Sequence, residues 1–164
     1  MNKITVGNVC FILNKDESSV LLLHRNREPM KGLWTGVGGK THFSEDIHSS
    51  CLREVQEETQ LSIENTTLKG VIKTILKDKD SSWILFIYTS IAQDTTLYPC
   101  DEGELAWVKK EEAKTLPFPG FIHEVFPHIL KENHFVEGTF LHDSQGKILE
   151  STLKVSTPNS LIPH

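Results

Sequence analysis

One helix-like segment separates two blocks of strand-like sequence, and this order constrains the fold more than any other feature of the chain. The first block contains two apolar runs, Val6–Leu13 and Val20–His24, whose polar connection is typical of a hairpin. The Ser44 hydroxyl can accept a free backbone N–H, so we predict a helix that Ser44 caps and that runs from Glu45 to about Thr59.

The second block follows this helix. We predict five further strands after this helix, at residues 68–76, 83–91, 104–108, 135–142 and 147–155. The first of them are rich in β-branched and aromatic residues, and the last two are predicted to form a closing hairpin. A second helix is predicted over Phe121–Lys131, and Pro127 is expected to bend or interrupt it. The glycine-rich stretch Pro29–Gly39 is predicted to be a loop. This order predicts an α+β fold, or a mixed β-sheet covered by helices.

The length indicates a single domain. A chain of 164 residues can bury one core but hardly two. We assign residues 1–155 to this domain and expect residues 156–164, which are polar and contain two prolines, to form a loose tail.

Charge and composition argue against several classes of partner. The net charge of -5 gives no bulk attraction to nucleic acid, so phosphate binding would require local cations or a bound metal. The three cysteines form no C-x-x-C pair, which favours reduced thiols in a cytoplasmic protein. The first residues do not resemble a signal peptide, and the most apolar run, at residues 84–88, is too short to span a membrane.

The predicted first helix carries an unusual acidic cluster. Glu54, Glu57 and Glu58 have the i, i+3, i+4 spacing that places side chains on one helical face. Like charges there repel one another, whereas a hard cation such as Mg²⁺ binds carboxylate oxygens. The alternative is a solvated acidic surface. Upstream, Gly38 would let a backbone carbonyl approach a metal, and Arg53 can pair with Glu57 or reach back to Glu45.

At this point the sequence resembles the Nudix hydrolases, whose box reads G-x5-E-x7-R-E-U-x-E-E-x-G-U, with U apolar. The matching positions are Gly39, Glu45, Arg53, Glu54, Val55, Glu57, Glu58 and Leu61. Gln60 departs from the pattern, because the family usually has glycine there; it must accept a strained backbone or use a different turn. Segments 32–40, 101–107 and 126–150 resemble MutT-like members that hydrolyse oxidised purine nucleoside triphosphates. The resemblance implies the Nudix fold, a mixed β-sheet sandwiched between helices.

The resemblance also implies roles for individual residues. Glu57, Glu58 and the Gly38 carbonyl would hold Mg²⁺, with Mn²⁺ as an alternative metal. Glu54 would bind metal and orient or deprotonate the attacking water. Glu102 is the predicted additional carboxylate from a later loop, and Glu104 is its competitor. Three further residues would support the structure of the box: Gly39, Glu45 and Arg53.

Four residues are candidates for substrate binding. Arg25 could contact a phosphate, or be an exposed charge at a strand end. Thr35 follows Trp34 at a position where oxidised-purine enzymes often have a base-reading Asn. Phe118 and Phe121 could line a base pocket, or pack in the core.

These observations leave three functional hypotheses. The first is a MutT-like pyrophosphohydrolase that converts a nucleoside triphosphate, such as 8-oxo-dGTP, to monophosphate and pyrophosphate. The second is a Nudix hydrolase of another small nucleotide substrate: ADP-ribose, a nucleotide sugar or a dinucleoside polyphosphate. The third is a non-catalytic Nudix fold that acts as a ligand sensor. Such modules usually lose box carboxylates, and this chain keeps all of them. The oligomeric state is left open.

Overall fold

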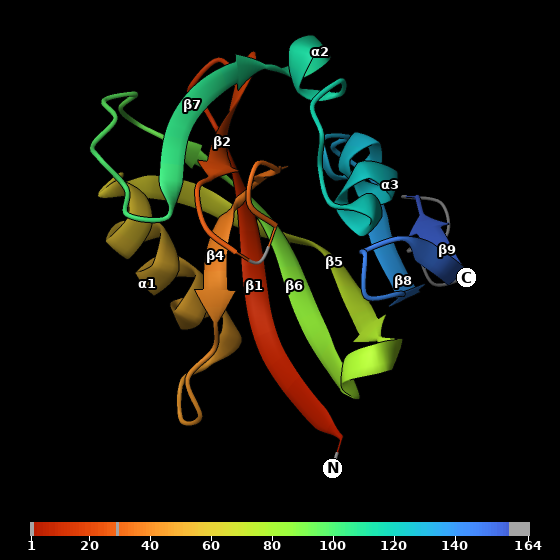
Figure 1. Cartoon of the computed structure of the whole chain (residues 1–164). Coiled ribbons are helices and arrows are strands. Elements are labelled where there is room, and N and C mark those ends of the chain that lie inside the picture. The colour runs from red at the N-terminus through yellow and green to blue at the C-terminus, as the bar shows by residue number, and fades with distance from the viewer. Residues whose placement is uncertain (1, 29, 158–164) are drawn as a thin grey trace.

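A computed structural model describes residues 2–28 and 30–157, in which a mixed sheet carries helices on both faces (Figure 1). The strands are β1 (Lys3–Leu13), β2 (Ser19–Arg25), β3 (Trp34–Thr35), β4 (Val37–Lys40), β5 (Ile63–Leu76), β6 (Ser81–Ala92), β7 (Gly103–Lys109), β8 (Phe135–His142) and β9 (Ile148–Ser156). The helices are α1 (Ile47–Thr59), α2 (Lys110–Ala113) and α3 (Gly120–Ile129), with one 3-10 turn, η1 (Lys77–Lys79).

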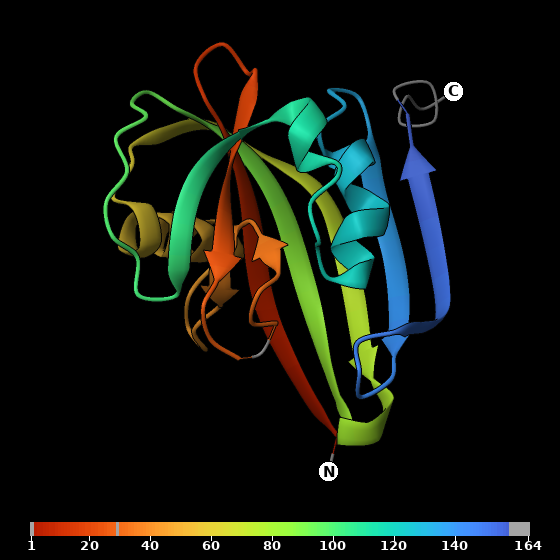
Figure 2. The same ribbon diagram turned by 45° about the horizontal axis from the view of Figure 1, so that its top comes forward.

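The sheet has the strand order β3-β2-β1-β6-β5-β8-β9, and β4 and β7 pair with β1 and β2 respectively. The pairs β1–β6 and β5–β8 are parallel, while the other pairs are antiparallel. The predicted mixed sheet between helices is therefore confirmed. Figure 2 shows α3 over the β5–β8 part of the sheet and α1 on the other side, beside β1 and β4.

The alternation of side chains along β1 explains why helices cover both faces of the sheet. Cys10 and Ile12 belong to one buried cluster, which includes Cys51 and Val55 of α1. The intervening Phe11 and Leu13 belong to a second cluster, formed with the apolar residues of α3. Because successive side chains of a strand point to opposite faces, an apolar run of this kind requires a layer on each side of the sheet.

The first hairpin is confirmed, since Ile12 pairs with Leu21 in β2. The loop predicted at residues 29–39 is wrong in part, because β3 and most of β4 lie within it. Short strands rich in glycine lack the β-branched signature that sequence reasoning requires, and here pairing with β1 and β2 forms them.

The predicted start of the first helix is wrong by two residues. The N-cap is Asp46, not Ser44, and its Oδ1 accepts the amide of Ser49 at 2.8 Å. Glu45 stays outside the helix, where its carboxylate accepts the amide of His42 at 3.0 Å and binds Arg53. Glu45 thus anchors the loop that precedes α1. Asp46 is then the residue that caps the free backbone amides of the first helical turn.

Other predictions concern elements later in the chain. Pro127 does not interrupt α3, which continues to Ile129. The closing hairpin is confirmed, but Ser156 belongs to β9 and not to the tail. Residues 158–164 of the predicted tail lie outside the described residues. Within residues 2–28 and 30–157, no helix combines the length and apolarity needed to cross a membrane.

Candidate active site

Two glycines of β4 let carboxylates of α1 approach the sheet. Gly39 pairs with Asn8 of β1, and a Cβ atom added to Gly39 would lie 2.5 Å from Oε1 of Glu54. The amide of Gly38 donates to Oε2 of Glu58 at 3.2 Å. Because Gly39 has no side chain, the Glu54 carboxylate can lie directly against β4, whereas a Cβ atom on Gly38 would instead meet the Asn8 carbonyl of β1.

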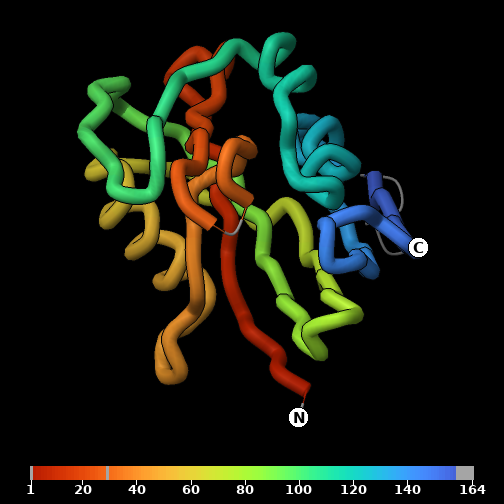
Figure 3. The backbone as a smooth tube through the Cα atoms, viewed as in Figure 1, coloured from red at the N-terminus to blue at the C-terminus, as the bar shows by residue number. Residues whose placement is uncertain are grey.

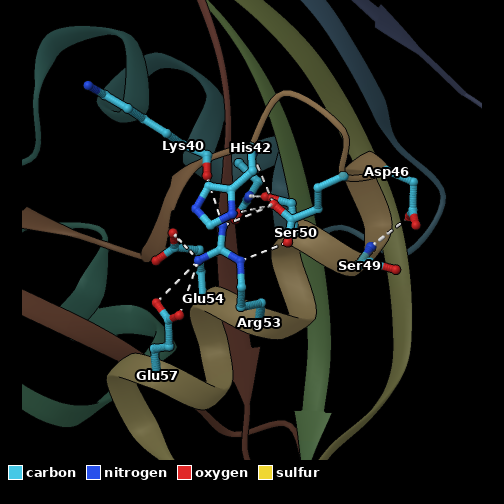
Figure 4. Close-up of polar contacts among 10 residues, drawn as sticks. Lys40, His42, Asp46, Ser49, Ser50, Arg53, Glu54 and Glu57 are labelled. Atoms are coloured by element: carbon cyan, nitrogen blue, oxygen red, sulfur yellow. Dashed lines mark hydrogen bonds and ion pairs between the residues drawn. The ribbon is translucent and has the colours of Figure 1, made fainter.

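Arg53 ties α1 to the preceding loop and to β4 (Figure 4). Its Nε and Nη2 donate to the two carboxylate oxygens of Glu45 at 2.7 and 3.0 Å. Nη1 donates to Glu54 at 3.0 Å and to Glu57 at 3.2 Å, and Nη2 also reaches the carbonyl of Lys40 at 3.0 Å. The hydrogen bonds from Arg53 hold the pKa of Glu45 at about 2. Both pairings expected of Arg53, with Glu57 and with Glu45, are confirmed.

Glu102 comes from the loop between β6 and β7, which passes close to α1 (Figure 3). Its carboxylate lies beside that of Glu58, and Nη1 of Arg25 is 3.7 Å from its Oε2. Glu104 lies in β7, where it is exposed and pairs with His24. The structure therefore brings Glu102, and not Glu104, to the carboxylates of α1, and its part in catalysis stays a prediction.

Burial and crowding make these carboxyl groups hard to ionise together. Burial, reinforced by the charge of the neighbouring Glu102, raises the pKa of Glu58 to about 9. Burial also raises the pKa of Glu54, although the hydrogen bond from Arg53 opposes this shift. Like charges that share a poorly solvated site favour protonation, unless a cation neutralises them.

The chemistry of this group fits a hard divalent cation. Such ions bind carboxylate oxygens, and the group offers the carboxylates of Glu54, Glu58 and Glu102 beside the Gly38 backbone. The Glu57 side chain is 58% exposed and lies at the edge of the group. In residues 2–28 and 30–157, no three His, Cys, Asp or Glu side chains already form a metal-coordinating group.

The residues predicted to contact substrate lie in different settings. Arg25 ends β2 beside Glu102, and its side chain is 14% exposed. Thr35 is buried in β3. Phe118 and Phe121 belong to the core cluster under α3, where the Phe118 ring centroid lies 4.8 Å from that of Phe126. The two phenylalanines thus occupy the core positions that were the alternative to a base pocket.

Sequence reasoning missed two side-chain contacts near this region. Asn8 is buried in β1; its Nδ2 donates to Oγ of Ser50 at 2.8 Å, which links the sheet to α1. The His24 ring stacks on Trp34 with ring centroids 4.6 Å apart. A signal for Asn8 was available in the sequence, because it is a polar residue within an apolar run.

A mixed sheet with a carboxylate-bearing helix packed on a glycine-rich strand defines a recognisable class of protein. The model of the NUDIX domain matches residues 3–129, so the chain belongs to the Nudix family. It is a hydrolase that acts on phosphorus-containing anhydrides, as members of this family do. Nudix hydrolases generally use divalent metals and act on small nucleotide derivatives.

Particular relatives agree with this assignment. The chain is 32% identical over 149 residues to a protein of Bacillus subtilis (strain 168) described as uncharacterized Nudix hydrolase YvcI, covering 87% of this chain and 90% of the relative. A MutT protein from Bacillus halodurans has a similar structure, with a TM-score of 0.81, 29% identity and coverage of 92% and 97% of the two chains. The NUDIX domain of Shewanella oneidensis NrtR, solved with ADP ribose, shares the fold, with a TM-score of 0.60, 20% identity and coverage of 79% and 86%.

Proposed function

We propose that this protein is a Mg²⁺-dependent pyrophosphohydrolase that converts a nucleoside triphosphate to a monophosphate and pyrophosphate. An oxidised purine nucleotide such as 8-oxo-dGTP is the first candidate substrate. One observation carries the proposal: the partly buried carboxylates of Glu54 and Glu58 meet Glu102 beside the Gly38 backbone. Crowded oxygen donors, in which burial raises the pKa of Glu54 and Glu58, are suited to a divalent cation and, through it, to an anionic substrate.

When bound, Mg²⁺ would neutralise phosphate oxygens and acidify a water molecule. Side chains of the protein would supply the base, its orientation and a further cation for the substrate. Glu54 is the proposed base, as the resemblance to the Nudix box implies, and burial raises the pKa of its carboxyl above the ordinary value, which favours proton acceptance. Arg53 orients Glu54 through the hydrogen bond at 3.0 Å. Arg25, beside Glu102, provides a cation to which a phosphate oxygen can bind.

The similarity to the MutT protein of Bacillus halodurans, over nearly the full length of both chains, supports a nucleoside triphosphate as substrate. Thr35 is buried and offers one hydroxyl in place of the two functional groups of an Asn side chain. We therefore expect the enzyme to accept several purine triphosphates rather than one oxidised base.

A panel of canonical and oxidised nucleoside triphosphates, ADP-ribose, nucleotide sugars and dinucleoside polyphosphates tests the proposal. Each substrate is incubated with Mg²⁺, with Mn²⁺ or with excess EDTA, and the products are separated by ion exchange. We expect monophosphate and pyrophosphate from triphosphates, and no turnover in EDTA. Turnover that survives EDTA contradicts the metal assignment, and faster release of AMP from ADP-ribose contradicts the substrate assignment.

Glu102 and Glu104 provide a matched pair of variants for the site itself. Glu102→Gln should lower kcat by about 100-fold, because it removes one negative charge from the group of carboxylates. This loss is equivalent to about 2.7 kcal/mol of transition-state stabilisation. Glu104→Gln carries the same chemical change two residues away on an exposed part of β7, and should keep kcat near that of the wild type. Melting temperatures of both variants serve as the folding control. Reversal of the two effects would show that Glu104 completes the site.

A further inference from the structure

The strand β9 has a long hydrogen-bonding edge that no other strand of the described residues covers. In the described part of the chain it pairs with β8 alone and ends the order of the sheet. Figure 2 shows its outer side facing away from the rest of the molecule. It is nine residues long and contains no proline, and residues Leu149 to Lys154 are all exposed. Edges of this length usually recruit another strand unless the protein protects them.

The two charged residues of β9 are placed symmetrically. Glu150 and Lys154 each lie two positions from Thr152, and all three project from the same face of the sheet because strand side chains alternate. Regular pairing with β8 extends from Leu141↔Glu150 to Glu137↔Lys154, with the irregularity only beyond it, between Leu141 and His142. Within the described residues, Glu150 has an apolar cross-strand neighbour and makes no ion pair.

We propose that β9 binds a second copy of this chain, with the two β9 strands antiparallel about a two-fold axis through Thr152. In this register Glu150 faces the partner's Lys154, and Lys154 faces the partner's Glu150. The two Thr152 residues face each other, and each exposed Leu153 packs beside the partner's Ser151. The sheet then continues across both subunits, and the edge is closed.

Charge selects this register over its neighbours. Glu150 and Lys154 are the only charged residues of β9, so the register centred on Thr152 is the one antiparallel alignment that opposes unlike charges. A shift that centres the pair on Glu150 or on Lys154 places like charges directly opposite, which is unfavourable. An isologous contact requires such self-complementarity, because the same patch serves both subunits. The carboxylate group on α1 lies toward the other end of the strand order, so pairing leaves it open (Figure 1).

Charge reversal tests the proposal on the full chain. Sedimentation velocity from about 1 µM to about 200 µM would measure the dimer Kd of the wild type and of three variants. Glu150→Lys and Lys154→Glu each place like charges opposite at two positions, and each should weaken the dimer by roughly tenfold or more. The double variant Glu150→Lys/Lys154→Glu restores both pairs and should return the Kd to that of the wild type. The kcat of all variants should stay unchanged, because these residues are exposed and remote from the α1 carboxylates. Lys154→Glu also stands opposite Glu137 of β8, so the variants that carry it should melt at a slightly lower temperature.

Cross-linking provides a second measurement that does not depend on charge. Thr152→Cys places two thiols opposite each other, so mild oxidation should give a covalent dimer. Ser156→Cys is the control, since in this register its two copies lie roughly 25 Å apart. A wild type that remains monomeric over the whole concentration range overturns the proposal. So does a dimer that single reversals leave intact, that the double reversal fails to restore, or that Ser156→Cys cross-links as readily as Thr152→Cys.

Discussion

Gln60 ends α1 in a backbone conformation that glycine adopts more easily. Its φ is 59° and its ψ is 14°, in the left-handed region, while its amide donates to the carbonyl of Gln56 at 3.0 Å. An L-residue in this region costs about 1–2 kcal/mol, whereas glycine loses an extra 0.5–1 kcal/mol or so of chain entropy on folding. Because the Gln60 side chain is exposed, little else is lost on its removal. Gln60→Gly should therefore increase the free energy of unfolding by about 0.5–1 kcal/mol and raise Tm by about 1–4 °C.

The control is the same substitution one helical turn earlier. Gln56 is also exposed but lies inside α1 with a right-handed backbone, so Gln56→Gly should lower the free energy of unfolding by about 0.7 kcal/mol. Urea unfolding followed by circular dichroism would measure both variants. The two changes are expected to have opposite signs. If Gln60→Gly destabilises the protein as Gln56→Gly does, the left-handed turn is not a source of strain and the argument fails.

Three further predictions concern other contacts. Gly39→Ala should reduce kcat by about 100-fold with little change in Tm, because its methyl group would displace the Glu54 carboxylate; unchanged kcat would contradict this. Burial lowers the pKa of His142, so the unfolded chain binds more protons and unfolding free energy should fall as pH drops below about 6.5. His142→Gln should flatten this dependence in urea titrations at several pH values. Lys69→Met removes buried hydrogen bonds to two carbonyls, at 2.7 and 3.0 Å, and should cost about 1–3 kcal/mol in the same assay.

The elements that sequence reasoning predicted well are those specified by local pattern. Alternating or continuous apolar runs were sufficient for β1, β2, β6 and β8, because burial on a sheet face requires them. The spacing of Glu54 and Glu58 was sufficient to place both carboxylates on one side of α1. The pairing of Arg53 with Glu45 and Glu57 also followed from separation along a helix and its preceding loop.

The elements that it missed depend on contacts between distant segments. β3 and β4 have too few strand-forming residues to be recognised, and they exist because β1 and β2 offer them partners. Ser44 and Asp46 are both suitable caps by composition. The choice of Asp46 follows from the commitment of the intervening Glu45 to Arg53, eight residues further along the chain.

The sequence by itself determined that an acidic helix carrying the Nudix box lies between strands, because helical periodicity is a local property and the residues of the box are contiguous. Only the tertiary structure decided between Glu102 and Glu104, since both stand in one short segment and local pattern cannot tell which side of it meets α1. The pairing of β7 with β2 settles this: it turns Glu104 outward opposite His24, and it leaves Glu102 in the turn beside Arg25 and Glu58. A long-range strand register is a property of two segments together, and neither segment encodes it alone.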